Sequence, residues 1–195
     1  MPDPKKVLVG LPDQLTTGAI LSAPVGTKMP TSIKEVDALD GEFKATGYVT
    51  SDGLSLATDI STNDIKEWGG ATARKVLESF DGTISWAEME MSYEAMCNAF
   101  GEENVKKTPA SAESGEQLTV SIGAHLPKPR SWVFKMKDGD ARIVILVPNG
   151  QVTSMDEITF NASDPISLPI TLSCYPGDSG ECIIVLTDDG QRTGA

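Results

Sequence analysis

The stretch that decides the fold is residues 71–101, which read ATARKVLESFDGTISWAEMEMSYEAMCNAFG. Residues 71–80 and 83–91 have strand-like composition and flank Asp81-Gly82, a dipeptide typical of a tight hairpin turn. Ser92 suits a helix N-cap and Gly101 the position after a helix, so we expect a short helix over residues 92–100. A helix this short is not stable alone, so it is expected to pack on a sheet.

The remainder of the chain predicts more short strands separated by turns. Residues 43–58 read as two strands around Ser51-Asp52-Gly53, residues 59–70 as a polar loop or one helical turn, and residues 106–117 as a polar loop. The total of about eight to ten strands with one flanking helix predicts a mainly β sandwich or barrel. The later expected strands are Leu118–Ile122, Ser131–Met136, Ala141–Val147, Val152–Phe160, Ile166–Tyr175 and Glu181–Thr187, with turns at Asp138-Gly139, Asn149-Gly150 and Pro176–Gly180.

One strand has a distinct pattern. The run Ile143–Val147 is apolar at every position, which is typical of a strand buried on both faces.

The first 40 residues read as an extended N-terminal arm, because prolines interrupt any regular element. Only Val7–Val9 and Ala19–Ser22 could pair briefly as strands there. The prolines of this arm are Pro2, Pro4, Pro12, Pro24 and Pro30.

Composition narrows the class of protein. The 195 residues carry 28 acids, 16 bases and one histidine, giving a formal charge of −12. Such a negative protein is poorly suited to hold a nucleic acid. The size fits a single domain over residues 1–195. The start of the chain does not resemble a signal peptide. No stretch approaches the roughly 20 apolar residues of a membrane span. The three cysteines, Cys97, Cys174 and Cys182, form no close pair in the sequence.

Several motifs that resemble catalytic or metal sites are better explained by a structural role. Gly177-Asp178-Ser179-Gly180 resembles the serine segment of trypsin-like proteases, and His125 lies upstream. We reject catalysis there because the spacing is too short, Glu181 stands where that family has glycine, and the segment suits a tight turn. One histidine and three scattered cysteines make no zinc site. We therefore expect neither an enzyme nor a cofactor, and read Glu78, Glu88 and Glu90 as acids on a solvated sheet face.

Trp68 differs from the other two tryptophans. Trp86 and Trp132 are expected in the core, whereas Trp68 lies between a polar stretch and Gly69-Gly70. An aromatic side chain in such a loop is a candidate anchor for a partner surface. Packing back on its own domain is the equal alternative.

Residues 45–101 resemble the major tail protein, or tail tube protein, of long-tailed (siphovirus-type) bacteriophages. The resemblance covers about 60 residues in order, as turns and anchor positions without a catalytic motif. Residues 18–27 of the N-terminal arm also resemble such proteins, whereas the last part of the chain adds only general β character. The matching positions are Gly47-Tyr48-Val49, Asp52-Gly53, Asp64-Ile65, Trp68-Gly69-Gly70, Glu78, Asp81 and the helix ending at Gly101.

The resemblance implies a fold and an assembly. Members of the family form a β-sandwich or barrel with a flanking helix, and hexameric rings stack into a tube that passes DNA during ejection. The long loop after the second strand, here residues 48–70, and the terminal arms would bridge rings. The subunit-contact candidates are Asp59, Thr62, Asp64, Ile65 and Trp68, and the lumen candidates are Glu78, Glu88 and Glu90.

The same resemblance implies partners and a location. The partners would be further copies of the chain, the tape measure protein and tail tip or terminator proteins, with no membrane and no specific binding of DNA. The protein would be made in the host cytoplasm and reside in the virion tail. Residues 1–34 carry four bases and two acids, whereas residues 35–68 carry two bases and eight acids. The arm could therefore dock on acidic blocks of a neighbouring subunit. Alternatives are a monomeric β-sandwich binding module, such as a virion decoration or adhesion domain, and a small hydrolase on a β scaffold.

Overall fold

The computed structural model describes residues 6–13 and 18–192, and within them the chain is mainly β. Nine strands form one antiparallel sheet in the order β3-β2-β8-β9-β10-β5-β4, with β1 also paired to β8 and β11 to β9; β6 and β7 form a separate pair. Two short helices and one 3-10 turn complete the fold. The strands are β1 (Leu11–Pro12), β2 (Ile20–Pro24), β3 (Lys44–Ala45), β4 (Val49–Lys66), β5 (Thr72–Glu88), β6 (Val105–Thr108), β7 (Gln117–Val120), β8 (Arg130–Asp138), β9 (Ala141–Met155), β10 (Leu168–Tyr175) and β11 (Ile184–Asp188), and the helical elements are α1 (Ile33–Val36), α2 (Tyr93–Phe100) and η2 (Glu102–Asn104).

The sheet has a hydrophobic core on each face. Under α2, Trp86, Trp132 and Phe134 pack together, with the Trp86 ring centroid 5.3 Å from each of the other two. On the opposite face, Leu21, Phe43, Val133 and Leu146 form a second core with α1 residue Val36. Strand β9 supplies both cores, which confirms the predicted burial on both faces for Val144–Val147, whereas Ile143 is only partly buried.

Helix α2 forms as its sequence predicts. The Ser92 hydroxyl accepts a hydrogen bond from the Ala95 amide at 3.2 Å, which satisfies one of the free amides of the first turn. Gly101 ends the helix at a φ of +90°, a conformation that a side chain disfavours. The buried face includes Ala95, Met96 and Ala99, which pack on the first core.

The hairpin predicted at Asp81-Gly82 is wrong. Strand β5 runs straight through this dipeptide, and Gly82 lies opposite Thr58 on β4 and Cys174 on β10. A Cβ at Gly82 would lie 2.8 Å from the Ile183 side chain, so this glycine marks close packing within a strand. The turn instead lies at Glu67–Gly70, where Gly70 has a φ of +89°.

The loop predicted over residues 48–70 is also wrong in detail. Val49–Lys66 is one long strand, and Ser51-Asp52-Gly53 falls in a bulge, where the register shifts between Val49 and Leu54. Alternation of apolar and polar residues signals a strand only where one face is buried. Beyond Thr58 nearly every residue of β4 is exposed, so that signal is weak although the backbone pairs fully.

Of the remaining predicted turns and loops, one forms as predicted and the others differ. Asp138-Gly139 is a turn as predicted, but β9 continues through Asn149-Gly150, because a Cβ on Gly150 would meet Trp132, Leu172 and Val147 at 3.0 Å. Pro176–Gly180 does not join a paired hairpin: β10 and β11 each pair with β9, along successive parts of one edge. The polar loop over residues 106–117 includes parts of β6 and β7, which pair with each other.

Candidate interaction surface

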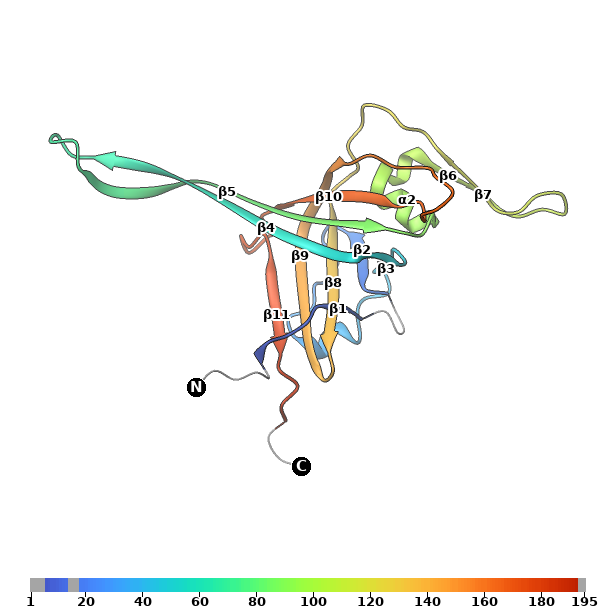
Figure 1. Ribbon diagram of the computed structural model, residues 1–195, viewed down its shortest axis with the longest axis horizontal. Coiled ribbons are helices and arrows are strands. Elements are labelled where there is room, and N and C mark those ends of the chain that lie inside the picture. Colours follow the sequence, from blue (N-terminus) through green and yellow to red (C-terminus); the bar gives the residue numbers. More distant parts are fainter. Residues whose placement is uncertain (1–5, 14–17, 193–195) are drawn as a thin grey trace.

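The longest exposed feature of the molecule is the β4–β5 hairpin. Here residues 59–81 are called the arm, and the paired segments Val49–Thr58 and Gly82–Glu88 are called the base. The base pairs with β10 and covers the first core, whereas β4 and β5 in the arm pair only with each other. Figure 1 shows the arm leaving the body on the side away from α2. An isolated two-stranded hairpin is marginally stable in water, so an arm of this length is suited to contact another surface.

One face of the arm continues the apolar face of the base. Directly opposed residues of an antiparallel pair point to the same side. The pair Leu54–Trp86, with Trp86 buried and Leu54 partly buried, is therefore followed on the same face by Leu56–Ile84, then by Thr58–Gly82 and then by Ile60–Phe80. Ile60 and Phe80 are exposed, as is Leu77 beyond the next register shift. The core thus continues outward as an uncovered apolar stripe.

The opposite face is polar over the base and the root of the arm, whereas Ile65, Val76 and Arg74 lie on it nearer the tip. Ser55, Ser85 and Thr171 lie in one row across β4, β5 and β10, and the hydroxyls of Ser85 and Thr171 are 3.0 Å apart. A second hydroxyl contact joins Thr153 and Ser173 at 2.7 Å. Farther out, the exposed carboxylates of Asp59 and Asp81 lie directly opposite each other. This face combines neutral hydroxyls with an acidic pair.

The five subunit-contact candidates all lie on the arm, but not on one face. Thr62 and Asp64 lie on the apolar-stripe face, where Asp64 pairs with Lys75 at 2.7 Å. Asp59 and the exposed Ile65 lie on the polar face. Trp68 lies in the turn at the tip and is 105% exposed, so it does not pack back on its own domain.

The three lumen candidates are dispersed. Glu78 is exposed at a register shift and accepts a hydrogen bond from Ser61, whereas Glu90 accepts one from the Tyr48 amide before β4. Glu88 is 1% exposed beside Trp86, whose indole N–H donates to it at 3.1 Å. Burial raises the pKa of Glu88 to about 8. A carboxyl inside the subunit is at odds with the prediction that Glu88 lines a lumen.

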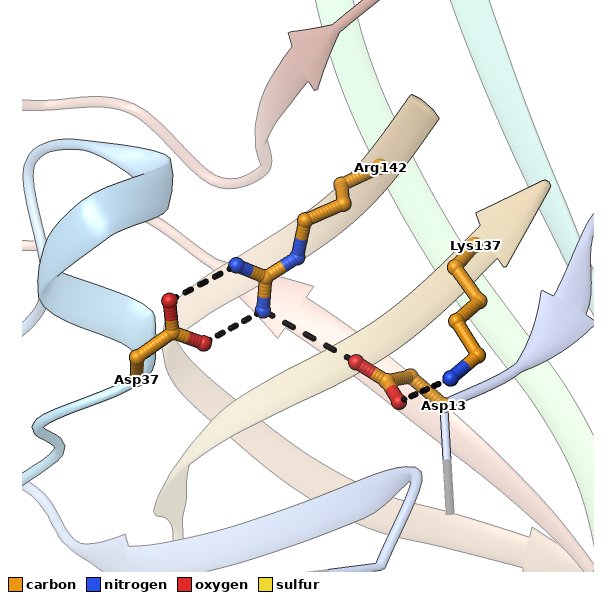
Figure 2. A network of polar contacts seen from close by, with 4 residues as sticks. All are labelled: Asp13, Asp37, Lys137 and Arg142. Atoms are coloured by element: carbon orange, nitrogen blue, oxygen red, sulfur yellow. Dashed lines mark hydrogen bonds and ion pairs between the residues drawn. The ribbon is translucent and has the colours of Figure 1, made fainter. Parts of the chain in front are cut away.

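The N-terminal segment is tied to its own sheet by charged contacts, as Figure 2 shows. Arg142 on β9 donates two hydrogen bonds to Asp37 after α1, at 2.8 and 2.6 Å, and these hold the pKa of Asp37 below its usual range. Asp13, after β1, lies 3.1 Å from Lys137 and 3.7 Å from Arg142. Val7–Val9 is not a strand; β1 instead forms at Leu11–Pro12, and β2 confirms the strand expected near Ala19–Ser22. Pro2 and Pro4 lie outside the described residues.

The remaining polar residues do not assemble into an evident reaction centre. His125 and Ser179 line different hollows of the surface. Within residues 6–13 and 18–192, no three His, Cys, Asp or Glu side chains are grouped to hold a metal ion. No helix in the same ranges is long and apolar enough to cross a membrane.

The sequence missed the apolar residues of the arm, Ile60, Leu77 and Phe80. The misplaced turn at Asp81-Gly82 assigned Phe80 to a hairpin end and Ile60 to a loop. These residues can be recognised as one apolar stripe only when β4 and β5 are aligned across the turn at Glu67–Gly70, because that alignment places Ile60 opposite Phe80.

Comparison with known proteins identifies a family. Residues 12–195 match a family model described as phage tail tube protein. No curated protein matches the chain. Among solved structures, a cap of the anti-feeding prophage, a tube-terminating cap, is 13% identical with a TM-score of 0.47, covering 95% of this chain and 97% of its own. A chain of a native gene transfer agent virion is 11% identical with a TM-score of 0.40, covering 77% of this chain and 92% of its own.

Proposed function

The chain belongs to the phage tail tube protein family, a structural component of phage tails, and from this premise we propose that it forms hexameric rings that stack into the tube. The whole chain, residues 1–195, acts as one tube domain. The tube is a passive, non-enzymatic conduit through which DNA is ejected into the host. The observation that carries this proposal is the arm, a long hairpin that continues the main sheet and that the described residues of its own subunit leave uncovered.

Ring formation uses the edges of the sheet. Strand β4 ends the sheet, and its outer edge is unpaired over 18 residues among the described parts of the chain. A long free edge exposes amide and carbonyl groups that pair readily with another strand. In a closed ring each subunit covers its neighbour's edge, so the proposed assembly removes the site at which uncontrolled pairing would begin.

The polar face of β4, β5 and β10 then lines the lumen. Its hydroxyl rows offer no positive charge to hold a phosphate, and Asp59 and Asp81 repel one. Glu78 is a further acid near this face. Glu88 and Glu90 instead accept hydrogen bonds within the subunit, from the Trp86 indole and the Tyr48 amide. Because screening limits these charges to about 8–10 Å, acids on the wall matter more than the net charge of −12.

Contacts between rings use the arm. Thr62, Asp64, Ile65 and Trp68 meet the next ring, and the N-terminal residues contribute where they are not tied to their own sheet. Further partners are the tape measure protein and the tail tip and terminator proteins at the tube ends. The protein is made in the host cytoplasm and is incorporated in the virion tail.

Electron microscopy of concentrated protein tests this function, with a variant in which residues 59–81 are replaced by Asn-Gly. Thr58 and Gly82 are directly opposed, so a two-residue turn closes the shortened hairpin. We expect sixfold rings and hollow tubes from the natural chain, and folded subunits without tubes from the variant, with circular dichroism as the folding control. A natural chain that stays monomeric under seeded, crowded conditions would support a decoration or adhesion module instead.

A further inference from the structure

Trp68 is an aromatic side chain with nothing to cover it. It lies at the tip of the arm, fully exposed, and is followed by two glycines that add no side chain around it. A tryptophan side chain buries a large apolar area when it enters a fitting pocket. Tryptophan is accordingly enriched among the residues that dominate the binding energy of interfaces. A surface that receives Trp68 is therefore expected on the partner of the arm.

An apolar hollow of about 180 Å³ lies beside the C-terminal end of α2. This α2 hollow is lined by Phe100, Ile122, Leu126, Pro127 and Met155, among other residues, and Ile122 and Leu126 are exposed there. A cavity of about 150 Å³ with apolar walls holds a benzene ring. The α2 hollow thus has the size and chemistry for an aromatic side chain.

The tip and the hollow lie at opposite ends of the molecule. At one end of β10, Cys174 lies opposite Gly82, where the arm begins; toward the other end, Ile170 lies opposite Met155 of the hollow. Figure 1 shows the same separation, with the arm and α2 on opposite sides of the body. A contact between unlike surfaces at opposite ends repeats without closing and generates a stack.

Charge favours the same pairing. The tip, residues 64–75, carries Lys66, Arg74 and Lys75 against two acids, Asp64 and Glu67, and so has a net charge of +1 in a chain of net charge −12. Next to the hollow lie Glu102 and Glu103 after α2 and Asp156 and Glu157 after Met155, all exposed, with Lys128 as the nearby base. Opposite charges around an apolar contact steer the partners and fix their orientation.

We propose that Trp68 of one subunit inserts into the α2 hollow of a second copy in the next ring. This inference rests on the proposed tube function and names the receiving surface for the arm. A larger hollow, about 490 Å³, lies between residues 25–31 and 176–181. Part of that hollow is the loop that follows β10, next to the root of the arm, so it suits a head-to-tail stack less well than the α2 hollow.

Two matched substitutions test the receiving surface. Leu126→Arg places a charge in the α2 hollow at a residue 59% exposed, and Ser179→Arg does the same in the larger hollow at an exposed residue next to the root of the arm. We expect Leu126→Arg and Trp68→Ala each to raise the protein concentration needed for tube growth about tenfold or more, while Ser179→Arg leaves it unchanged. Circular dichroism and the unfolding midpoint confirm that each subunit is folded.

Crosslinking gives a readout that does not depend on tube yield. Glu67→Cys, which keeps Trp68, and Leu126→Cys proteins, both also carrying Cys182→Ser, are mixed and oxidised, and the expected product is a covalent dimer that neither variant forms alone. Tubes that form normally with Leu126→Arg, or a mixture that gives no mixed dimer, would overturn the inference while leaving the tube function intact. A natural chain that forms no rings at all would instead overturn the tube function.

Discussion

The base and the arm of the β4–β5 hairpin share two strands and one ladder but differ in what covers them. In the base, Trp86 and Ile84 are buried in the first core and Leu54 packs against it, although Leu56 is exposed; in the arm, both members of the pair Ile60–Phe80 face solvent. The backbone pairing is continuous across the boundary at Thr58–Gly82. The difference indicates that the arm is folded by pairing alone and keeps an apolar face for a second protein, whereas the base stabilises the subunit.

The strongest way to break this comparison is to truncate a tryptophan in each region. Trp86→Ala removes a buried ring from the base and is expected to lower the free energy of unfolding by about 3–5 kcal/mol. Trp68→Ala removes an exposed ring at the tip and should change it by less than about 0.5 kcal/mol. Urea unfolding of the unassembled subunit measures both, and equal losses would mean that the arm contributes to the core after all.

The base also contains a buried acid, which gives it a pH dependence. The pKa of Glu88 is about 8 in the folded chain against an ordinary 4.5. The folded state therefore keeps a proton that the unfolded state loses, so this contribution to stability is full below pH 4.5 and is lost as the pH rises through 8. At about 1.4 kcal/mol per pKa unit, the loss amounts to a few kcal/mol.

Glu88→Gln isolates this effect. The variant should lack the fall in unfolding free energy between pH 5 and about pH 8.5, while Glu78→Gln, a change at an exposed acid of the arm, should keep it. Unfolding curves at a series of pH values supply the measurement. If Glu88→Gln and the natural chain decline in parallel, the carboxyl is ionised in the folded state at neutral pH.

The N-terminal segment is an intermediate case, held on the body by the apolar contacts of the second core and also by charged contacts. Arg142→Ala removes the contacts to Asp37 and Asp13 and is expected to cost about 1 kcal/mol, since Asp37 is largely exposed. Hydrogen exchange should accelerate around β1 and α1 and stay unchanged in β5. Lys75→Ala, which breaks the Asp64 pair on the arm, serves as the control and should not affect β1.

The smallest effect is expected in the arm itself. Asp59 and Asp81 are directly opposed like charges, so Asp81→Asn should stabilise the arm by a few tenths of a kcal/mol. Slower hydrogen exchange in residues 59–66 at low salt, with a smaller gain at high salt, would show it. Asp52→Asn, at an exposed acid of the base, is the matched control.

Local sequence signals predicted helix α2 correctly but predicted two turns wrongly. Ser92 and Gly101 defined α2 correctly because capping depends on nearby residues alone. Asp81-Gly82 and Asn149-Gly150 read as turns, yet both glycines lie within strands, where a side chain would collide with residues distant in sequence. No local pattern reports such packing, and none reports pairing where both strand faces are solvated, as in the arm. The sequence alone marks Trp68 as a candidate anchor, whereas its full exposure and the hollow proposed to receive it follow only from the fold.

The unequal surroundings of the three tryptophans have an optical consequence. Trp86 and Trp132 lie edge to face in the core, whereas the Trp68 indole is in water. The emission of the unassembled chain should contain a red-shifted component that acrylamide quenches and that Trp68→Phe removes. Burial of the tip in a growing tube would shift that component to the blue, so the natural chain carries its own fluorescent reporter of assembly.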